Sequence, residues 1–341
     1  MAGLLSQQNS LWGKTGQAAN RQCTPQPESC QSAGPAPSLV IVIIGPTAIG
    51  KSRLALSLAQ TFGGEVINAD SRQVYRYMDI GTAKPPPEER ALVPHHLLDV
   101  VDPDQEFSLA LYQGLAYRAM EDVLGRGHLP LLVGGSGLYV WAVVEGWQVP
   151  PVPPDPTLRR ELEATARQEG ADALYLRLRE VDPAAAEAVD RRNPRRLVRA
   201  LEVSLGQGRP WARRKAPPPY AFRLIGLTAP RPQLYQLIDS RVDTMVEKGL
   251  VAEVEALLQR GYSLSLPALS GVGYRQIGLY LKGELSLEEA IRQTKFHTHR
   301  IARHQYAWFR PADPRLHWLD INEDPEAQAR RLVEEWLHEV H

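Results

Sequence analysis

The sequence is poor in cysteine, with two, Cys23 and Cys30, among its 341 residues. Both stand in the N-terminal segment, before the first stretch that is typical of folded structure. Neither a disulfide framework nor a paired-cysteine metal site is therefore available. The chain also lacks any apolar run near the ~20 residues that span a bilayer, and its start has none of the features of a secretory signal. We expect a cytoplasmic monomer without membrane contact.

An excess of charge of one sign is also lacking, because 39 Lys and Arg balance 39 Asp and Glu. A net charge of zero argues at first against a nucleic-acid partner, but the basic residues are unevenly distributed. Residues 191–215 hold nine Lys or Arg and a single acid, Glu202, and residues 292–310 hold five Lys or Arg, three His and no acid. Two such segments can present a basic stripe to a phosphate backbone.

The order of the predicted elements indicates an α/β fold. Residues 1–37 are rich in Gln, Ser, Ala, Gly and Pro, and are predicted to be a disordered extension or an artefact of the chosen start site. After them, buried strands alternate with helices, which predicts a doubly wound parallel sheet. The strands are expected at 39–44, 65–70, 129–133 and 222–227, with helices at 51–60 and 108–124.

Proline-rich segments at 150–154 and 216–219 bracket a region in which only helices are predicted. We expect residues 150–220 to form a helical insertion domain in a core made of residues 38–149 and 221–341. The insertion helices are predicted at 156–167, 171–179, 183–189 and 194–205, the last with Asn193 as its N-cap and Pro194 as its first helical residue. Long C-terminal helices are predicted at 234–260 and 287–309.

A phosphate-binding motif lies between the first predicted strand and the first predicted helix. It fits the pattern G-x-x-x-x-G-K-[ST] with Gly45, Pro46, Thr47, Ala48, Ile49, Gly50, Lys51 and Ser52. Backbone N–H groups and the positive end of the helix dipole surround an anion in such a loop. Lys51 adds a formal charge, and the Ser52 hydroxyl is placed to ligate Mg²⁺. The motif predicts a P-loop NTPase-like core that binds a di- or triphosphate, without indicating which.

The phosphate loop alone leaves several classes of protein open. A small-molecule kinase would bind ATP there and need a lid with arginines. A motor or GTPase would need an aliphatic strand that ends in a metal-binding Asp. The sequence contains neither a convincing strand of that kind nor an N-K-x-D guanine motif.

Asp70 stands at the carboxyl end of the second predicted strand. We expect this strand beside the phosphate-loop strand, which places Asp70 in the crevice where open α/β sheets bind ligands. A carboxylate there can be a metal ligand, a general base or the cap of a following turn.

Eight motifs, in order from about Val40 to Arg310, resemble those of the tRNA dimethylallyltransferase family. After the phosphate loop come NADSRQVY (68–75), MDIGTAKP (78–85), PHHLLD (94–99), GGSGLY (134–139), NPRRLVRALEV (193–203), GVGYRQ (271–276) and RHQYAWFR (303–310). The resemblance implies transfer of a dimethylallyl group from dimethylallyl diphosphate to the exocyclic N6 of adenine 37, beside the tRNA anticodon.

The resemblance also implies roles for single residues. The phosphate loop would hold the donor's diphosphate, and Lys51, the loop N–H groups and Mg²⁺ would stabilise the charge that grows on it as it leaves. Asp70 would accept the proton from N6. Ser136 stands where the family commonly has Thr and keeps a hydroxyl near the reacting centre, although a capping Ser in a turn is also compatible. Arg241 resembles an arginine that reaches the donor phosphates, the alternative being a surface helix arginine.

The expected macromolecular partner is the tRNA anticodon stem-loop, whose adenine must be splayed out before it reacts. Asp70, Ser136 and the segment Ser71, Arg72 and Gln73 are expected to line the pocket for that base. The other predicted tRNA-binding residues are Arg159, Arg195, Arg196, Leu197, Val198, Arg199, Gly273, Tyr274, Arg275, Arg303, His304, Gln305 and Arg310.

Within 194–205, Leu197, Leu201 and Leu205 recur at helical spacing and are expected to be buried, while the arginines point elsewhere. Such an arginine-rich face is often only solvated. The scarcity of acids that could pair with it favours phosphate contact here.

Three other functions stay open. An adenylate isopentenyltransferase would share the phosphate loop but would not need the basic segments. A small-molecule P-loop kinase is the second alternative. A non-catalytic RNA-binding module is the third, and it leaves the phosphate loop unexplained.

Overall fold

The computed structural model describes residues 38–150, 152, 155–207, 215–216 and 218–340. The predicted extension at 1–37 and parts of both proline-rich linkers lie outside these residues. Within them, one parallel sheet has the strand order β3-β2-β4-β1-β5-β6. The strands are β1 (Ser38–Ile44), β2 (Gly64–Asn68), β3 (His95–His96), β4 (Leu129–Val133), β5 (Tyr220–Thr228) and β6 (Leu316–Asp320).

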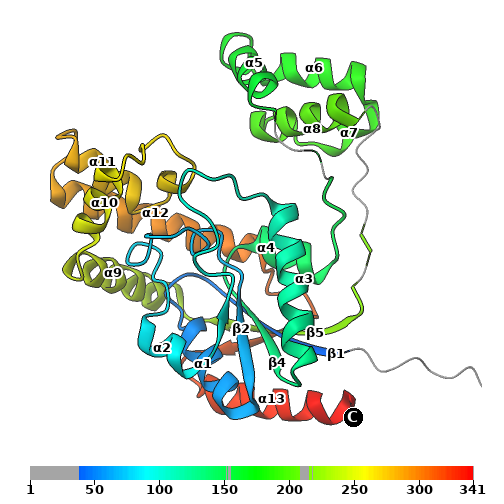
Figure 1. Ribbon diagram of the computed structural model, residues 1–341, viewed down its shortest axis with the longest axis vertical. Coiled ribbons are helices and arrows are strands. Elements are labelled where there is room, and N and C mark those ends of the chain that lie inside the picture. The colour runs from blue at the N-terminus through cyan, green and yellow to red at the C-terminus, as the bar shows by residue number, and fades with distance from the viewer. Residues whose placement is uncertain (1–37, 151, 153–154, 208–214, 217, 341) are drawn as a thin grey trace, which may run out of the picture. The chain divides into compact units, whose positions relative to one another are not determined.

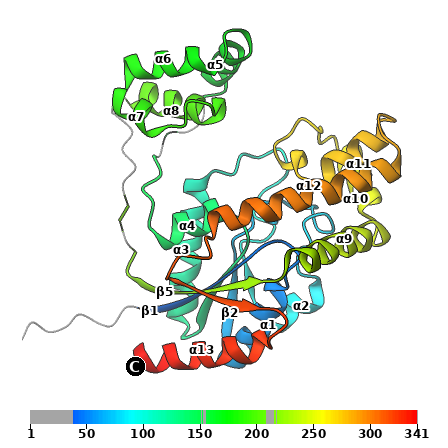
Figure 2. The same cartoon turned by 180° about the vertical axis from the view of Figure 1, so that it is seen from behind.

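Helices cover both faces of the sheet (Figures 1 and 2). On one face lie α1 (Lys51–Phe62) and α13 (Pro325–Val340), and on the other α3 (Leu109–Gly125) and α4 (Gly137–Val144). A hydrophobic core lies on each face of the sheet, and successive side chains of β1 point into the two cores in turn. Ile41 and Ile43 pack on the α1 side, and Val40 and Val42 pack on the α3 side. This explains the uninterrupted apolar run, since a strand buried on both faces has no position for a polar side chain.

The expectation that the strand before Asp70 pairs with the phosphate-loop strand is wrong. β4 lies between them, pairing in parallel with β1 on one side and with β2 on the other. The loops that follow β1, β4 and β2 therefore stand in a row at the carboxyl edge of the sheet. The β4 loop occupies the middle, which places Ser136 between the phosphate loop and Asp70.

Between α4 and β5, the described residues form helices that share a hydrophobic core of their own. The helices are α5 (Pro156–Gln168), α6 (Ala171–Val181), α7 (Pro183–Ala188) and α8 (Pro194–Gln207). Leu162, Leu174, Leu178 and Leu201 are fully buried in this core. All four predicted helices are confirmed, with ends that shift by one or two residues. Asn193 caps α8, because its side-chain oxygen accepts from the Arg196 N–H at 3.3 Å.

The single helix predicted at 234–260 is two helices, α9 (Arg231–Glu247) and α10 (Leu250–Gln259). The break falls at Gly249, whose φ of 98° lies in the left-handed region that ends the first helix. The remaining elements are α2 (Pro87–Leu92), the short 3₁₀ helix η1 (Ala268–Ser270), α11 (Tyr274–Leu281) and α12 (Leu287–Trp308). Among the described residues, no helix combines the length and apolar character required to cross a bilayer.

Candidate active site

A cavity of about 950 Å³ opens at the carboxyl edge of the sheet. Its floor comes from the loops after β1, β4 and β2, and its walls from α9, α12 and the segments 81–86 and 270–274. This is the position at which open α/β sheets bind ligands. The cavity brings together Lys51, Asp70, Ser136 and Arg241, which are far apart in the sequence.

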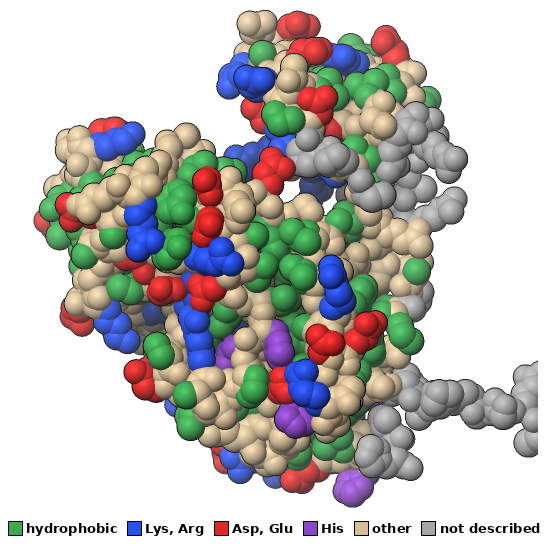
Figure 3. Space-filling model, viewed as in Figure 1, with side chains coloured by type: hydrophobic (Ala, Val, Ile, Leu, Met, Phe, Trp, Pro, Cys, Tyr) green, Lys and Arg blue, Asp and Glu red, His purple; other side chains and the backbone are tan. Residues whose placement is uncertain are grey.

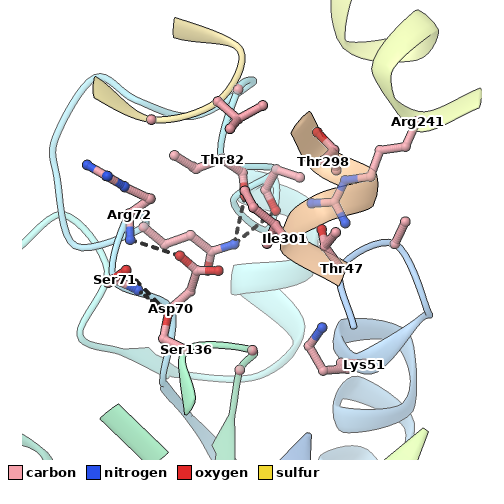
Figure 4. Close-up of a pocket in the computed structure, with 18 of the residues that line it drawn as sticks. Thr47, Lys51, Asp70, Ser71, Arg72, Thr82, Ser136, Arg241, Thr298 and Ile301 are labelled. Atoms are coloured by element: carbon pink, nitrogen blue, oxygen red, sulfur yellow. Dashed lines mark hydrogen bonds between the residues drawn. The ribbon is translucent and has the colours of Figure 1, made fainter. Parts of the chain in front are cut away.

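The phosphate loop and α9 place two cations on one side of this cavity. Lys51 donates from Nζ to the Pro46 carbonyl at 2.7 Å. Figure 4 shows the Arg241 guanidinium extending from α9 towards Thr298 and Thr47, above the phosphate loop. Neither cation forms an ion pair with a carboxylate among the described residues. The arrangement is suited to an anion that carries more than one charge.

Burial lowers the pKa values of both cations. The pKa of Lys51 falls to about 7, mainly through burial and also through the positive charge of Arg241, while Asp70 opposes the shift. Burial likewise lowers the pKa of Arg241 from its ordinary value. A bound anion would reverse this effect for Lys51, because an opposite charge nearby favours the protonated form.

On the other side of the cavity, hydrogen bonds fix Asp70 and Ser136 relative to each other. The Ser136 hydroxyl oxygen accepts from the Ser71 N–H at 3.0 Å (Figure 4). One oxygen of Asp70, Oδ1, accepts from the Arg72 N–H at 2.8 Å, so Asp70 caps the turn that follows its strand. Its other oxygen has no donor among the described residues and is free to accept a proton. Buried Asn68 accepts from the Asp70 N–H at 2.9 Å, so the carboxylate stands on a fixed turn.

Arg72 and Gln73, predicted to read the tRNA, direct their side chains to the protein backbone. Arg72 donates from Nη1 to the Ala268 carbonyl at 3.0 Å, which connects the Asp70 loop to η1. Gln73 donates from Nε2 to the carbonyls of Thr82 and Ala83, each at 3.1 Å. Both residues line the cavity, but these groups shape its wall and are already occupied.

Another carboxylate supports the same wall from α10. Glu253 accepts from the N–H groups of Asp79, Ile80 and Gly81, and from the Tyr274 hydroxyl at 2.6 Å. Tyr274, one of the predicted tRNA-binding residues, has 1% of its surface exposed, so its side chain has a packing role.

In the insertion, the side chains of four predicted tRNA contacts are engaged within the protein. Leu197 and Val198 are buried in the core of the insertion, so their side chains cannot meet RNA. Arg159 forms two hydrogen bonds to buried Glu202 at 2.9 and 2.8 Å. The scarcity of acidic partners expected for the arginines of α8 does not hold for Arg199, which also approaches Glu202, at 3.4 Å.

Arg195 and Arg196 are exposed, and neither has an ion-pair partner among the described residues. They remain the candidates for phosphate contact in this helix. Leu205, expected in the buried stripe, is 41% exposed. On the face shown in Figure 3, Lys and Arg side chains are interspersed with Asp and Glu.

The predicted residues near the C-terminus divide into two groups. Arg275, Arg303 and Arg310 are exposed, and His304 is exposed while it lines the cavity. Gln305 is half-buried and its amide hydrogen-bonds the phosphate loop, an arrangement different from the predicted contact with RNA. Gly273 lies at the start of α11 on the cavity wall.

Sequence reasoning missed the face of α12 that lines the cavity. This face includes Thr294, His297, Thr298, Ile301 and Trp308. Each of them lies three or four residues from another residue of this face or from His304, as the helical period requires, and this spacing would have identified them once His304 was accepted as a site residue.

The metal ligands that the cavity offers fit a magnesium ion that is held largely by a substrate. No cluster of three or more His, Cys, Asp or Glu with metal-binding geometry occurs among the described residues. The Ser52 hydroxyl lines the cavity next to Lys51. Magnesium characteristically binds through one or two protein groups, substrate phosphates and water, so a full protein cage is not required.

The fold and this cavity define a P-loop protein of the transferase type, with a phosphate site facing a carboxylate and a hydroxyl. Residues 73–312 match the family model described as IPP transferase, and residues 38–95 match that described as isopentenyl transferase. By this match the chain belongs to the IPP transferase family, and curated relatives that it resembles are named tRNA dimethylallyltransferase.

Two such relatives show the extent of the similarity. The chain is 51% identical to the tRNA dimethylallyltransferase of Roseiflexus sp. (strain RS-1) over 300 residues, 87% of this chain and 98% of the relative. It is 49% identical to that of Thermomicrobium roseum over 304 residues, 88% and 92% of the two chains.

Solved structures agree with this assignment. The full-length tRNA isopentenylpyrophosphate transferase from Bacillus halodurans matches with a TM-score of 0.66 and 40% identity, over 89% of this chain and 98% of that one. A eukaryotic dimethylallyltransferase acting on tRNA matches with a TM-score of 0.74 and 27% identity, over 89% and 80% of the two chains.

Proposed function

We propose that this protein transfers a dimethylallyl group from dimethylallyl diphosphate to the exocyclic amine of the adenine beside the tRNA anticodon. The observation that carries the proposal is that one cavity holds a carboxylate, Asp70, together with two half-buried cations, Lys51 and Arg241, that have no ion-pair partner among the described residues. The cations suit the leaving diphosphate, and the carboxylate suits the amine that loses a proton. The names of the relatives support tRNA as the acceptor.

The chemistry assigned to each residue follows from where charge develops. As the allylic C–O bond breaks, negative charge grows on the diphosphate, and Lys51, Arg241 and the loop N–H groups stabilise it more strongly than in the ground state. The amine forms the new C–N bond and passes its proton to the free oxygen of Asp70. Ser136, hydrogen-bonded to the Asp70 turn, holds a hydroxyl at the same place.

Mg²⁺ is the proposed cofactor, with the Ser52 hydroxyl as its protein ligand. When bound with the donor, it would neutralise part of the diphosphate charge. The proposed setting is the cytoplasm, where tRNA substrates are available.

The test is a transfer assay with labelled dimethylallyl diphosphate, Mg²⁺ and an unmodified tRNA transcript. We expect label in the tRNA and a dimethylallyl-adenosine among its nucleosides, with no label when guanine replaces the target adenine. Free AMP serves as the second acceptor. Modification of AMP in preference to tRNA would instead indicate an adenylate isopentenyltransferase, and no labelled product on either acceptor would reject the proposal.

A further inference from the structure

Gln305 of α12 connects two of the three loops that form the floor of the cavity. Its side-chain oxygen, Oε1, accepts from the Thr47 N–H of the phosphate loop at 2.9 Å. Its side-chain nitrogen, Nε2, donates to the Gly135 carbonyl in the β4–α4 turn at 2.9 Å. The orientation of the amide follows from its partners, because a backbone N–H can only donate and a carbonyl can only accept. One amide thus joins the loop after β1 to the loop after β4.

The close approach of this amide depends on the absence of a side chain at Gly135. A Cβ atom built there would lie 2.2 Å from Gln305 Nε2 and 3.3 Å from the Gly45 carbonyl oxygen. The first distance is far below van der Waals contact, so any larger residue would displace the amide. The turn before Ser136 and the start of the phosphate loop therefore share one tightly packed contact with Gln305.

The helix that carries Gln305 is itself held against α4. Trp141 of α4 donates from its indole nitrogen to the Trp308 carbonyl at 2.9 Å, and Phe309 has 1% of its surface exposed. The Trp308 ring lies directly over Gly137, where a Cβ atom would approach it to 2.4 Å. These contacts fix the last turns of α12, so the position of the Gln305 amide is set by the scaffold and the two loops adjust to it.

We propose that Gln305 is a positioning residue that sets the separation between the phosphate loop and the Ser136 turn. This inference rests on the proposed function. The separation then aligns the diphosphate donor with the Ser136 hydroxyl and, through the Ser71 N–H, with the Asp70 turn. Small misplacements of reacting groups lower rates steeply, by as much as about a hundredfold for 1 Å. Gln305 acts through the two loops without touching either substrate.

This role differs from the RNA contact that the sequence indicates for Gln305. Its carbonyl and amide groups both face backbone groups of the cavity floor. Contact with a base would require breaking at least one of these bonds. A residue that reads RNA would change the affinity for tRNA, whereas a positioning residue changes the rate at saturating substrates.

Two variants test the two hydrogen bonds of the Gln305 amide. Gln305→Met has a similar length but loses both hydrogen bonds. Gln305→Glu keeps an acceptor for the Thr47 N–H and places an oxygen against the Gly135 carbonyl. The matched control is Gln293→Met, on the same helix, where the amide bonds the Glu289 side chain outside the cavity. For each protein, kcat, the KM of both substrates and Tm are measured in the transfer assay.

We expect Gln305→Met to lower kcat about tenfold to a hundredfold, with the KM for tRNA changed less than about twofold and a Tm close to that of the control. Gln305→Glu should lower kcat as well but retain a KM for the donor nearer to that of wild type, because its bond to the phosphate loop remains. The control should retain the wild-type kcat.

Several results would overturn the proposal. A raised KM for tRNA with kcat unchanged would favour RNA contact, and wild-type kinetics in both variants would show that the connection is dispensable. Unfolding of both variants, while the control folds, would make Gln305 a structural residue. Inactivity of wild type on every adenine acceptor would instead reject the proposed function, which keeps the two failures apart.

Discussion

The cavity and the insertion both contain clustered arginine or lysine, but they hold these cations in different ways. In the cavity, Lys51 and Arg241 are half-buried and have no carboxylate partner among the described residues, and burial lowers the pKa of each. In the insertion, Arg195 and Arg196 are exposed, and Arg159 and Arg199 share buried Glu202.

The difference indicates two kinds of anion. Keeping two like charges together out of water is costly, and the cost is recovered only when a multiply charged ligand binds there. Exposed arginines need no such ligand to be stable, and their contacts with phosphate are weaker, additive and sensitive to salt. We therefore propose a small diphosphate as the ligand of the cavity and a phosphate backbone as the ligand of the insertion.

The largest effect is expected from the carboxylate that faces the two cations. Asp70→Ala should lower the transfer rate by about two to four orders of magnitude, because it removes the proton acceptor. Binding of tRNA should stay within a few fold of wild type. Rates at saturating substrates test this, with the exposed Asp104→Ala as control. Retention of more than about a tenth of the wild-type rate would remove Asp70 from its catalytic role.

A second effect follows from the pKa of Lys51, about 7 in the free protein. A bound diphosphate raises this pKa, so above pH 7 binding must take up a proton and affinity falls as pH rises. Below pH 7 the lysine is already protonated and contributes no such dependence. Between pH 7.5 and 9, where the donor itself is ionised, we expect a fall of up to about tenfold per pH unit.

Calorimetric titration of dimethylallyl diphosphate across this range provides the measurement. Lys51→Arg is the control, because a guanidinium stays protonated throughout. No fall in affinity in wild type, or the same fall in the arginine variant, would show that Lys51 does not take up a proton on binding.

A smaller effect is expected in the insertion. Replacing Arg195 and Arg196 with Ala should weaken the binding of all substrate tRNAs about equally. It should also flatten the slope of log affinity against log salt concentration by about one to two units. The rate at saturating tRNA should change little. Arg167 and Arg179, exposed in the same insertion, supply the matched double variant. Equal slopes in wild type and in the Arg195 and Arg196 variant would show that this face is only solvated.

The smallest effect concerns Arg159, which the structure pairs with Glu202. Arg159→Ala should lower the free energy of unfolding by about 1 kcal/mol, since buried Glu202 loses its best partner while Arg199 stays near. The salt dependence of tRNA binding should not change. Chemical denaturation and the same salt series test both points, with exposed Arg160→Ala as control. A flattened slope without loss of stability would make Arg159 an RNA contact.

Much of the fold could be predicted because the buried strands have strong local signals. β1 and β4 are continuous apolar runs, and α5, α7 and α8 each begin with proline after an Asp or Asn, such as Asn193 before Pro194. The two-residue β3 has no period to detect. The helix break at Gly249 resembles a tolerated glycine inside a helical pattern. The position of β4 between β1 and β2 depends on tertiary pairing, which local pattern does not contain.

For the site, too, some features could be predicted from the sequence and others could not. Lys51, Asp70 and Ser136 each follow a strand, so their meeting at one edge of the sheet could be expected from the parallel topology. The side-chain partners of Arg72, Gln73 and Gln305 could not be predicted. Each satisfies a backbone group from a distant segment, and a sequence does not show which backbone groups lack partners.

The most direct test of the account is a transfer reaction in the complete absence of ATP and other nucleoside triphosphates. If the phosphate loop holds the donor's own diphosphate, dimethylallyl diphosphate and tRNA should react fully, with one diphosphate released for each adenine modified. Adding ATP should not increase the rate, and no ADP should form. A requirement for ATP, or ADP formed in step with the product, would contradict the assignment of this cavity to the prenyl donor.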